Sequence, residues 1–207
     1  MKRAFAALIS LVAATAFPAA AQPIVVEVFA NQNCGACPKA HANMAKLEAA
    51  RDDVLILTWS VDYWDYLGAP DPMALPEANA RQAAYAERFG LRGPYTPQTV
   101  YDGAVQCPGN KMRQVTRQLD RRADTPLPLT FIAGADGTFT LNGETDTAVD
   151  VRLIHIADIP GMPMVNPVLA VEKMDTNSHL VPTCEGRCVL VAQAPGYGEI
   201  KAAAWVQ

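Results

Sequence analysis

The sequence contains no run of lysines or arginines interleaved with aromatic side chains, and its formal net charge at pH 7 is -4. Nucleic acids are bound by basic surfaces, so we expect no nucleic acid among its partners. The sequence also lacks the G-x-S-x-G motif of serine hydrolases and has only 3 histidines. This scarcity leaves no convincing pair of nucleophile and base for hydrolysis. Beyond the first 21 residues, no apolar stretch is long enough to cross a membrane.

The first 21 residues have the pattern of a secretory signal peptide. Lys2 and Arg3 precede an apolar run over Ala4–Phe17, and small residues follow as far as Ala21. The run is shorter than the ~18–20 residues that a retained membrane anchor needs. We expect cleavage after Ala21 and a periplasmic or secreted mature chain that starts at Gln22, with no membrane span.

Two units are predicted after this leader, at residues 22–124 and 125–207. In the first unit, hydrophobic periodicity and turn residues predict strands and helices in the order βαβαββα. The predicted segments are a strand at 24–30, a helix from 37, a strand at 53–62, a helix at 76–90, a hairpin around 102–103 and a helix at 110–123. The second unit has short alternating runs separated by glycine, proline, aspartate and asparagine turns, which predicts antiparallel β structure.

The motif Cys34-Gly35-Ala36-Cys37 lies between the first predicted strand and the first predicted helix. A C-x-x-C motif in this position of a βαβ pattern resembles the redox site of the thioredoxin fold. The partial positive charge and free N–H groups of a helix N-terminus stabilise a thiolate, so Cys34 is the candidate nucleophile. Cys37 would then attack the mixed disulfide at Cys34 and release the substrate, leaving a Cys34–Cys37 disulfide. The predicted fold class is α/β, a thioredoxin-like domain followed by a β-rich unit.

Three further residues are candidates for the redox site. In the thioredoxin fold a cis-proline lies against the dithiol and frees the preceding backbone to pair with an extended substrate. The resemblance gives this role to Pro97, with Thr96 as the backbone partner. Glu27 is a lone acid in an otherwise apolar strand. It either accepts a proton from Cys37, as a buried acid does in thioredoxins, or is solvated at a sheet edge.

The same motif also allows a metal site. Cys34, Cys37 and His41 form a set of soft ligands for Cu(I), and residues of the C-terminal unit could extend it. These residues are Met162, Met164, Met174, His155 and His179. However, thioredoxin-like copper carriers have the wider spacing C-x-x-x-C-P, and methionine is more often a core residue. We expect no cofactor, keep copper as the alternative, and expect His41 to pack between helix and sheet.

The chain has 5 cysteines, and an odd number in an exported protein leaves one unpaired or shared. Cys184 and Cys188 flank a turn at Gly186, and we expect a local disulfide between them. The alternative is a second redox pair, which is disfavoured because neither cysteine starts a predicted helix. Cys107 is then the leftover thiol.

Val61–Pro72 has the sequence VDYWDYLGAPDP, and Tyr95-Thr96-Pro97-Gln98 follows within Ala80–Gly103. The aromatic residues of the first segment either line a groove beside the dithiol or pin a helix to the sheet, and its acids are interpreted as caps and hydrogen-bond acceptors. These segments resemble a bacterial secreted family with a thioredoxin-like domain, catalogued as domain of unknown function 1223. The resemblance implies the fold, export and a thiol-redox site at Cys34, Cys37 and Pro97, and it names no substrate.

The function expected from the sequence is that of an exported thiol-disulfide oxidoreductase whose partners are protein thiols or disulfides. One alternative is a periplasmic copper-binding or copper-delivery protein on the same fold. The other is a non-catalytic binding module in which the C-G-A-C motif is a structural disulfide.

Overall fold

The structure is a computed structural model, and it describes residues 22–157, 159–176 and 179–206. The predicted signal peptide lies outside these residues. In the part of the chain that is described, no helix is long and apolar enough to span a membrane.

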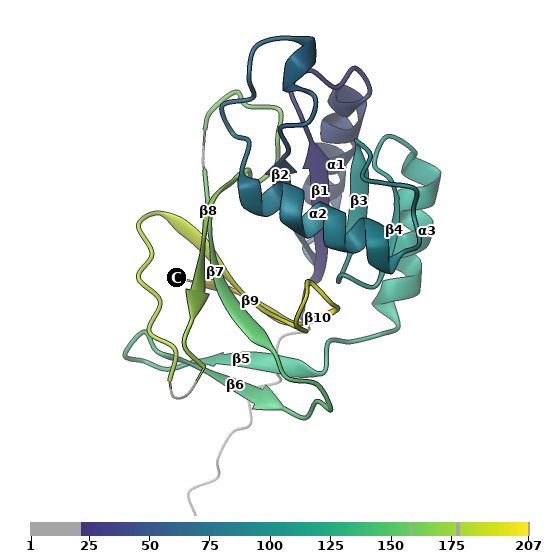
Figure 1. Cartoon of the computed structure of the whole chain (residues 1–207). Coiled ribbons are helices and arrows are strands. Elements are labelled where there is room, and N and C mark those ends of the chain that lie inside the picture. Colours follow the sequence, from purple (N-terminus) through teal and green to yellow (C-terminus); the bar gives the residue numbers. More distant parts are fainter. Residues whose placement is uncertain (1–21, 158, 177–178, 207) are drawn as a thin grey trace, which may run out of the picture.

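The described residues form a mixed α/β fold with several sheets and few helices (Figure 1). In chain order the elements are β1 (Ile24–Ala30), α1 (Cys37–Ala50), β2 (Val54–Ser60), the 3-10 helix η1 (Asp65–Leu67), α2 (Pro76–Arg88), β3 (Gln98–Tyr101), β4 (Val105–Pro108), α3 (Met112–Ala123), β5 (Leu129–Ala133), β6 (Phe139–Gly143), β7 (Asp150–Ile156), β8 (Val168–Met174), β9 (Arg187–Gln193) and β10 (Ile200–Val206). The predicted order βαβαββα is therefore confirmed for the first unit, and short strands follow it as expected.

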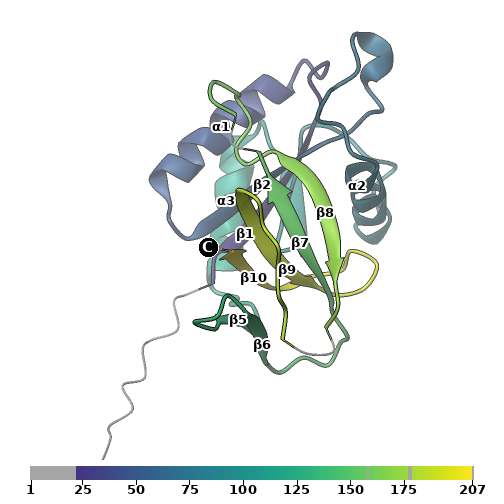
Figure 2. The same cartoon turned by 90° about the vertical axis from the view of Figure 1, so that its left-hand side faces the viewer.

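The first sheet has the strand order β2-β1-β3-β4. β1 and β2 are parallel, whereas β3 is antiparallel to both of its neighbours, β1 and β4. Figures 1 and 2 show α1 and α3 on one face of this sheet and α2 on the other. Because β1 lies inside the sheet with both faces covered, every residue of this strand is buried, which explains its nearly continuous apolar sequence.

Helices α1 and α2 both begin with a proline in the first turn. Pro38 in α1 and Pro76 in α2 are tolerated there because a first-turn N–H has no helical partner to lose. In α1 the buried face includes His41, and in α2 it includes Arg81 and Tyr85. Helical periodicity therefore turns these three polar side chains toward the protein interior.

The second sheet is antiparallel, with the strand order β10-β9-β7-β8, and the hairpin β5-β6 forms a separate two-stranded sheet. Leu129 and Phe131 of β5 pack against Leu153 of β7 and Leu190 of β9. This apolar cluster covers one face of the second sheet. The other face contributes to a core that also contains residues of the first sheet.

That shared core joins Val25 and Phe29 of β1 to Ile154 of β7 and Val189 of β9. Tyr85 of α2 belongs to the same cluster. Residues on both sides of the predicted boundary at position 124 are therefore packed together in one hydrophobic interior.

A buried polar network lies within this shared core. The Arg81 Nε donates to a Glu27 carboxylate oxygen at 2.5 Å, and its Nη2 donates to Gln193 Oε1 at 2.8 Å. The Tyr85 hydroxyl donates to the other Glu27 oxygen. Glu27 is fully buried on an interior strand, so the expectation that it is solvated at a sheet edge is wrong. Its charge is tolerated there because Arg81 pairs with it.

The connection between β7 and β8 docks on the edge of β2. The Thr58 N–H donates to the Asn166 carbonyl at 3.1 Å, and the Asn166 side-chain amide donates to the Ile56 carbonyl at 2.9 Å. These bonds pair some of the backbone N–H and C=O groups on the edge of β2, which would otherwise lack hydrogen-bond partners. They also hold the segment Met162–Met164 close to the end of the first sheet where α1 begins.

Candidate functional site

Cys34 and Cys37 form a disulfide at the start of α1. These residues are 5% and 1% exposed, respectively, and the Cys37 N–H donates to the Cys34 carbonyl at 3.0 Å. Gly35 between them is exposed, and no atom lies within 4 Å of the position that a Cβ would take there. The open side of this turn is therefore the side of Gly35, and Cys34 is the more accessible of the two sulfur-bearing residues.

The loop before Cys34 is anchored by acids of the segment Val61–Pro72. The Asn31 side-chain amide donates to Asp65 Oδ1 at 2.9 Å, and the Gln32 N–H donates to Asp71 Oδ2 at 2.8 Å. Asp65 Oδ1 also accepts the Asp71 N–H at 3.1 Å. Asp65 and Asp71 are thus hydrogen-bond acceptors, as interpreted from the sequence, and they fix the position of the disulfide loop.

Trp64 connects the disulfide to the Thr96–Pro97 peptide. Its ring packs against the buried cluster that contains both cysteines, and its Nε1–H donates to Thr96 Oγ1 at 2.7 Å. The Thr96–Pro97 bond is cis, in agreement with the expectation from the sequence. The Pro97 carbonyl accepts the N–H of Gly109 at 2.9 Å, and a Cβ at Gly109 would lie 3.3 Å from the Ala40 Cβ in the first turn of α1. Thr96 and Pro97 therefore lie beside the start of α1.

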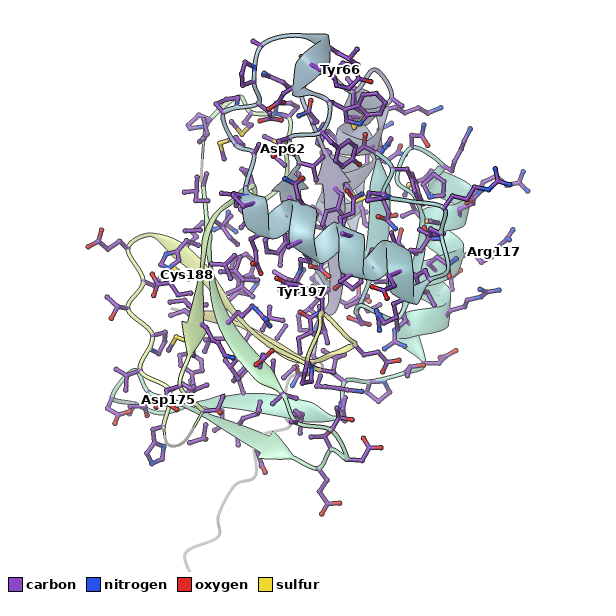
Figure 3. The ribbon with its side chains drawn as sticks, in the orientation of Figure 1. Asp62, Tyr66, Arg117, Asp175, Cys188 and Tyr197 are labelled. Carbon is purple, nitrogen blue, oxygen red and sulfur yellow. A yellow bond between two sulfur atoms is a disulfide. The ribbon has the colours of Figure 1, made fainter. Side chains whose placement is uncertain are left out.

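The aromatic segment was expected either to pin a helix to the sheet or to line a groove beside the dithiol, and different residues fit the two roles. The Tyr63 hydroxyl donates to Gln82 Oε1 at 3.0 Å and so attaches the segment to α2. Burial raises the pKa of Tyr63 to about 12, so this hydroxyl remains a donor at neutral pH. Trp64 and Tyr66 instead stack at 6.1 Å between ring centroids, and Tyr66 is 76% exposed at the top of the molecule in Figure 3. An aromatic surface thus extends from the disulfide to solvent.

Glu27 is a candidate from the sequence that faces a different part of the molecule. Within the described residues, its hydrogen bonds run to Arg81 and Tyr85 and to neither cysteine. Burial and the negative charge of Glu27 raise the pKa of Tyr85, which keeps its hydroxyl protonated and donating. The contacts of Glu27 are those of a structural ion pair between β1 and α2.

A cavity of about 340 Å³ lies next to Cys37 on the side of α1 that faces the β7–β8 connection. Its lining residues are Asn31, Gln32, Cys37, Pro38, His41, Asp71, Pro72, Met73, Met162, Pro163 and Met164. His41 is 7% exposed, and its Nδ1 has no hydrogen-bond partner in the described part of the chain. Burial lowers the pKa of His41, and the charge of Asp71 opposes this effect. The imidazole is therefore neutral at pH 7.

The structure separates the residues that were considered as metal ligands. Cys37, His41, Met162 and Met164 line one cavity, whereas Cys34 is not among its lining residues. The remaining three candidates lie elsewhere: His155 contacts Glu172, His179 lines another cavity, and Met174 packs in the core around β5 and β6. Among the described residues, no three side chains of histidine, cysteine, aspartate or glutamate are grouped to hold a metal. Met73 also lines this cavity, but the sequence did not suggest it as a ligand, because no local sequence pattern connects it to His41.

The other cysteines lie apart from this site. Cys184 and Cys188 form the expected disulfide, and Cys188 belongs to the second sheet, away from Tyr66 (Figure 3). His155 Nδ1 lies 3.5 Å from the Cys188 sulfur. Cys107 is a buried free thiol whose sulfur lies 3.5 Å from the Tyr101 hydroxyl, so it is the leftover thiol that the sequence predicted.

Comparison with solved structures shows that the fold occurs in proteins of two bacteria. The crystal structure of protein AGR_C_4864 from Agrobacterium tumefaciens is similar, with a TM-score of 0.74 and 24% sequence identity over 91% of this chain and 96% of that chain. HBP35 of Porphyromonas gingivalis is also similar, with a TM-score of 0.58 and 15% identity over 89% of this chain and 74% of that chain. At these identities the likeness concerns the fold alone.

A comparison with curated proteins gives no match. The profile of a family described as "Protein of unknown function (DUF1223)" matches residues 25–159. This match confirms the resemblance noted in the segments around Val61–Pro72 and Ala80–Gly103. Because the matched region covers more than half of the chain, the protein belongs to the DUF1223 family.

Proposed function

We propose that the protein is an exported thiol-disulfide oxidoreductase that acts through Cys34 and Cys37. The observation that carries the proposal is the position of their disulfide at the start of α1, packed against Trp64, with Trp64 hydrogen-bonded to Thr96. A disulfide that only staples a loop has no need of a neighbouring aromatic surface that extends to solvent. A disulfide that exchanges with a polypeptide does need a surface on which the polypeptide can bind.

The arrangement of the first sheet supports a thioredoxin-like fold. The parallel pair β1 and β2, the antiparallel strands β3 and β4, and helices on both faces follow the pattern that the sequence suggested. In such a fold the C-x-x-C motif starts the helix after the first of these strands, and a proline precedes the third. Cys34, Cys37 and Pro97 occupy these positions.

The proposed reaction is thiol-disulfide exchange, which runs in either direction. To oxidise a substrate, a substrate thiolate attacks the Cys34 sulfur, the Cys34–Cys37 bond breaks, and Cys37 leaves as the thiolate. A second substrate thiolate then attacks the substrate sulfur of the mixed disulfide and releases Cys34 as a thiolate. Two electrons pass from the substrate to the protein, and a substrate disulfide forms. To reduce a substrate, the same steps run in reverse, from the Cys34 thiolate.

Cys34 is assigned the attacked sulfur for two reasons. It is the more exposed of the pair, and the neighbouring Gly35 leaves the approach open. Cys37 is inside the first turn of α1, where the partial positive charge at the helix N-terminus stabilises a leaving thiolate.

The proposed substrate is a protein thiol or disulfide in an extended segment. Thr96 is half-buried beside the disulfide and would offer its backbone to such a segment, with Pro97 forming the wall behind it. Exposed Tyr66 stacks on Trp64, which is hydrogen-bonded to Thr96, and it supplies an apolar surface near this position. The proposed location is the periplasm or the extracellular space, where both disulfides would persist.

The test uses the chain from Gln22 with Cys37→Ser, reduced and then mixed with oxidised glutathione or a disulfide-containing peptide. We expect a mixed disulfide at Cys34, detected by intact mass and peptide mapping, because Cys37 is no longer present to resolve it. The matched control is Cys34→Ser, which keeps Cys107, Cys184 and Cys188 and should accumulate much less adduct.

Two outcomes would contradict the proposal. One is an adduct that forms equally in both variants, which would place the reactivity on another cysteine. The other is a wild-type Cys34–Cys37 disulfide that does not exchange with a glutathione redox buffer at all. That second result would favour the non-catalytic binding module.

A further inference from the structure

Three methionines and one histidine from separate segments line the cavity next to Cys37. His41 comes from α1, Met73 from the connection between η1 and α2, and Met162 and Met164 from the connection between β7 and β8. All three methionines are half-buried, and the Met164 sulfur lies 3.8 Å from the Ser60 hydroxyl at the end of β2. The cavity therefore collects thioether groups that are far apart in the sequence.

His41 lines this cavity, and one nitrogen of its imidazole is buried without a partner among the described residues. More than nine-tenths of the residue is buried, and its Nδ1 makes no hydrogen bond to any described residue. A buried polar atom without a partner costs about 1–3 kcal/mol. In a neutral imidazole one ring nitrogen has a free lone pair that a ligand can use.

Asp71 adds a negative charge beside His41 and positions one of the methionines. It is 7% exposed, its Oδ2 accepts the Gln32 N–H, and its Oδ1 accepts the Met73 N–H at 2.9 Å. The Asp71 carboxylate thus holds the backbone of Met73 at the cavity. Its charge would partly compensate a single positive charge bound there.

We propose that this cavity binds Cu(I) through the imidazole of His41 and the thioether sulfurs of Met73, Met162 and Met164. Thioether sulfur is a soft ligand that selects Cu(I) over the hard cations, and imidazole is a good copper ligand. Thioethers are flexible and polarisable, so the three side chains can close around an ion within a cavity of this size.

The proposed ligand set does not require reduced cysteines. An imidazole and three thioethers remain available while Cys34 and Cys37 are joined in a disulfide, as they are in this structure. The site therefore suits an oxidising compartment, where thiol ligands are consumed by disulfide formation. When the disulfide is reduced, the Cys37 thiolate, which also lines the cavity, becomes a further soft ligand. The inference goes beyond the proposed oxidoreductase function and does not depend on it.

The first test titrates Cu(I) anaerobically into the disulfide-intact chain from Gln22, in competition with the chelator bicinchoninate. We expect one bound equivalent in the wild type. We expect the affinity to fall by more than about tenfold in Met162→Leu/Met164→Leu and in His41→Gln, because loss of even an outer-shell partner commonly costs that much. Leucine conserves the volume of methionine, so the double variant should fold. The matched control is Met174→Leu in the core around β5 and β6, which should bind as the wild type does.

The second test follows the methionine methyl groups by NMR while Ag(I), a redox-inert analogue of Cu(I), is added to the oxidised protein. Of the six methionines after Met1, we expect the methyl signals of Met73, Met162 and Met164 to shift. The signals of Met44, Met112 and Met174 should stay in place, because these residues lie outside the cavity.

Three results would overturn the inference. The first is affinity unchanged in both His41→Gln and the double methionine variant. The second is copper bound only by the reduced protein and lost on Cys34→Ser, which would assign binding to the dithiol. The third is a set of methyl shifts that excludes the cavity methionines. Failure of the glutathione exchange experiment would leave these measurements unaffected, so the two proposals fail independently.

Discussion

The substitution Glu27→Gln tests whether the buried acid of β1 is a structural ion partner or a proton acceptor for Cys37. The introduced glutamine would keep the shape of Glu27 and one oxygen acceptor, but it would remove the charge that faces Arg81. Burial by itself lowers the pKa of Arg81, and the charge of Glu27 raises it above the ordinary value. In the variant the Arg81 guanidinium would therefore be left charged and without its carboxylate partner.

The expected loss of stability follows from the burial of both partners. The side chains of Arg81 and Glu27 are each 0% exposed, and Arg81 Nη1 already lacks a hydrogen-bond partner among the described residues. Gln193 and the Trp59 ring, whose centroid is 4.7 Å from the guanidinium carbon, still contact Arg81 but carry no negative charge. Removing one partner of a buried ion pair costs about 3–5 kcal/mol. For a chain of this length, that corresponds to a fall in Tm of roughly 6–20 °C.

The assay combines urea unfolding with the pH dependence of the glutathione exchange rate. We expect a large loss of unfolding free energy and an unchanged pH profile, because the Glu27 hydrogen bonds run to Arg81 and Tyr85. Glu199→Gln is the control, since the Glu199 side chain is 53% exposed and breaking its pair with Lys201 should cost less than about 1 kcal/mol. A loss below about 1 kcal/mol for Glu27→Gln, or a shifted pH profile, would refute the reasoning.

Two further predictions concern His41 and a glycine between the two units. Burial lowers the pKa of His41 below its ordinary value of 6.5, so just below pH 6.5 the unfolded state binds more protons than the folded state. The contribution of His41 to stability is therefore fully present above pH 6.5 and is lost as the pH falls below it. Thermal unfolding at about pH 7.5 and about pH 5.5 should show a smaller pH effect in His41→Gln, and an equal effect would contradict this assignment. Gly103 has φ of +63°, and an added Cβ would lie 2.5 Å from the Gly198 carbonyl oxygen. Gly137 is the control, because it has φ of +78° and no atom lies within 4 Å of the position that a Cβ would take there. Gly103→Ala should lower the unfolding free energy by at least about 1 kcal/mol more than Gly137→Ala does. Equal losses in the two variants would exclude a role for the clash.

Much of the fold could be predicted because its signals are local. The apolar run at Ile24–Ala30 and the proline at the start of the next two helices depend only on neighbouring residues. The helix predicted at 76–90 is found at Pro76–Arg88, a difference within the usual uncertainty of helix ends. The alternating runs after residue 124 also form strands, because alternation of apolar and polar residues between turn residues is typical of β structure.

The candidate site was only partly predictable. The pairings of Cys34 with Cys37 and of Cys184 with Cys188 span separations of 3 and 4 residues, so spacing alone suggested them. The direction of the Glu27 side chain was not predictable, because an interior strand with both faces covered gives no alternation from which a face can be read. The partner that stabilises Glu27 is 54 residues away in the sequence.

The sequence by itself determined the order of strands and helices, the likeness to a known family and the cysteines that pair, because these depend on residue types at short spacing. Only the tertiary structure decided that Trp64 connects the disulfide to Thr96 and that His41 shares a cavity with three methionines. The contact between Ser60 and Met164, for example, joins residues 104 positions apart. Such contacts arise when the β7–β8 connection docks on the edge of β2, and that docking is a property of the packed fold rather than of any local pattern.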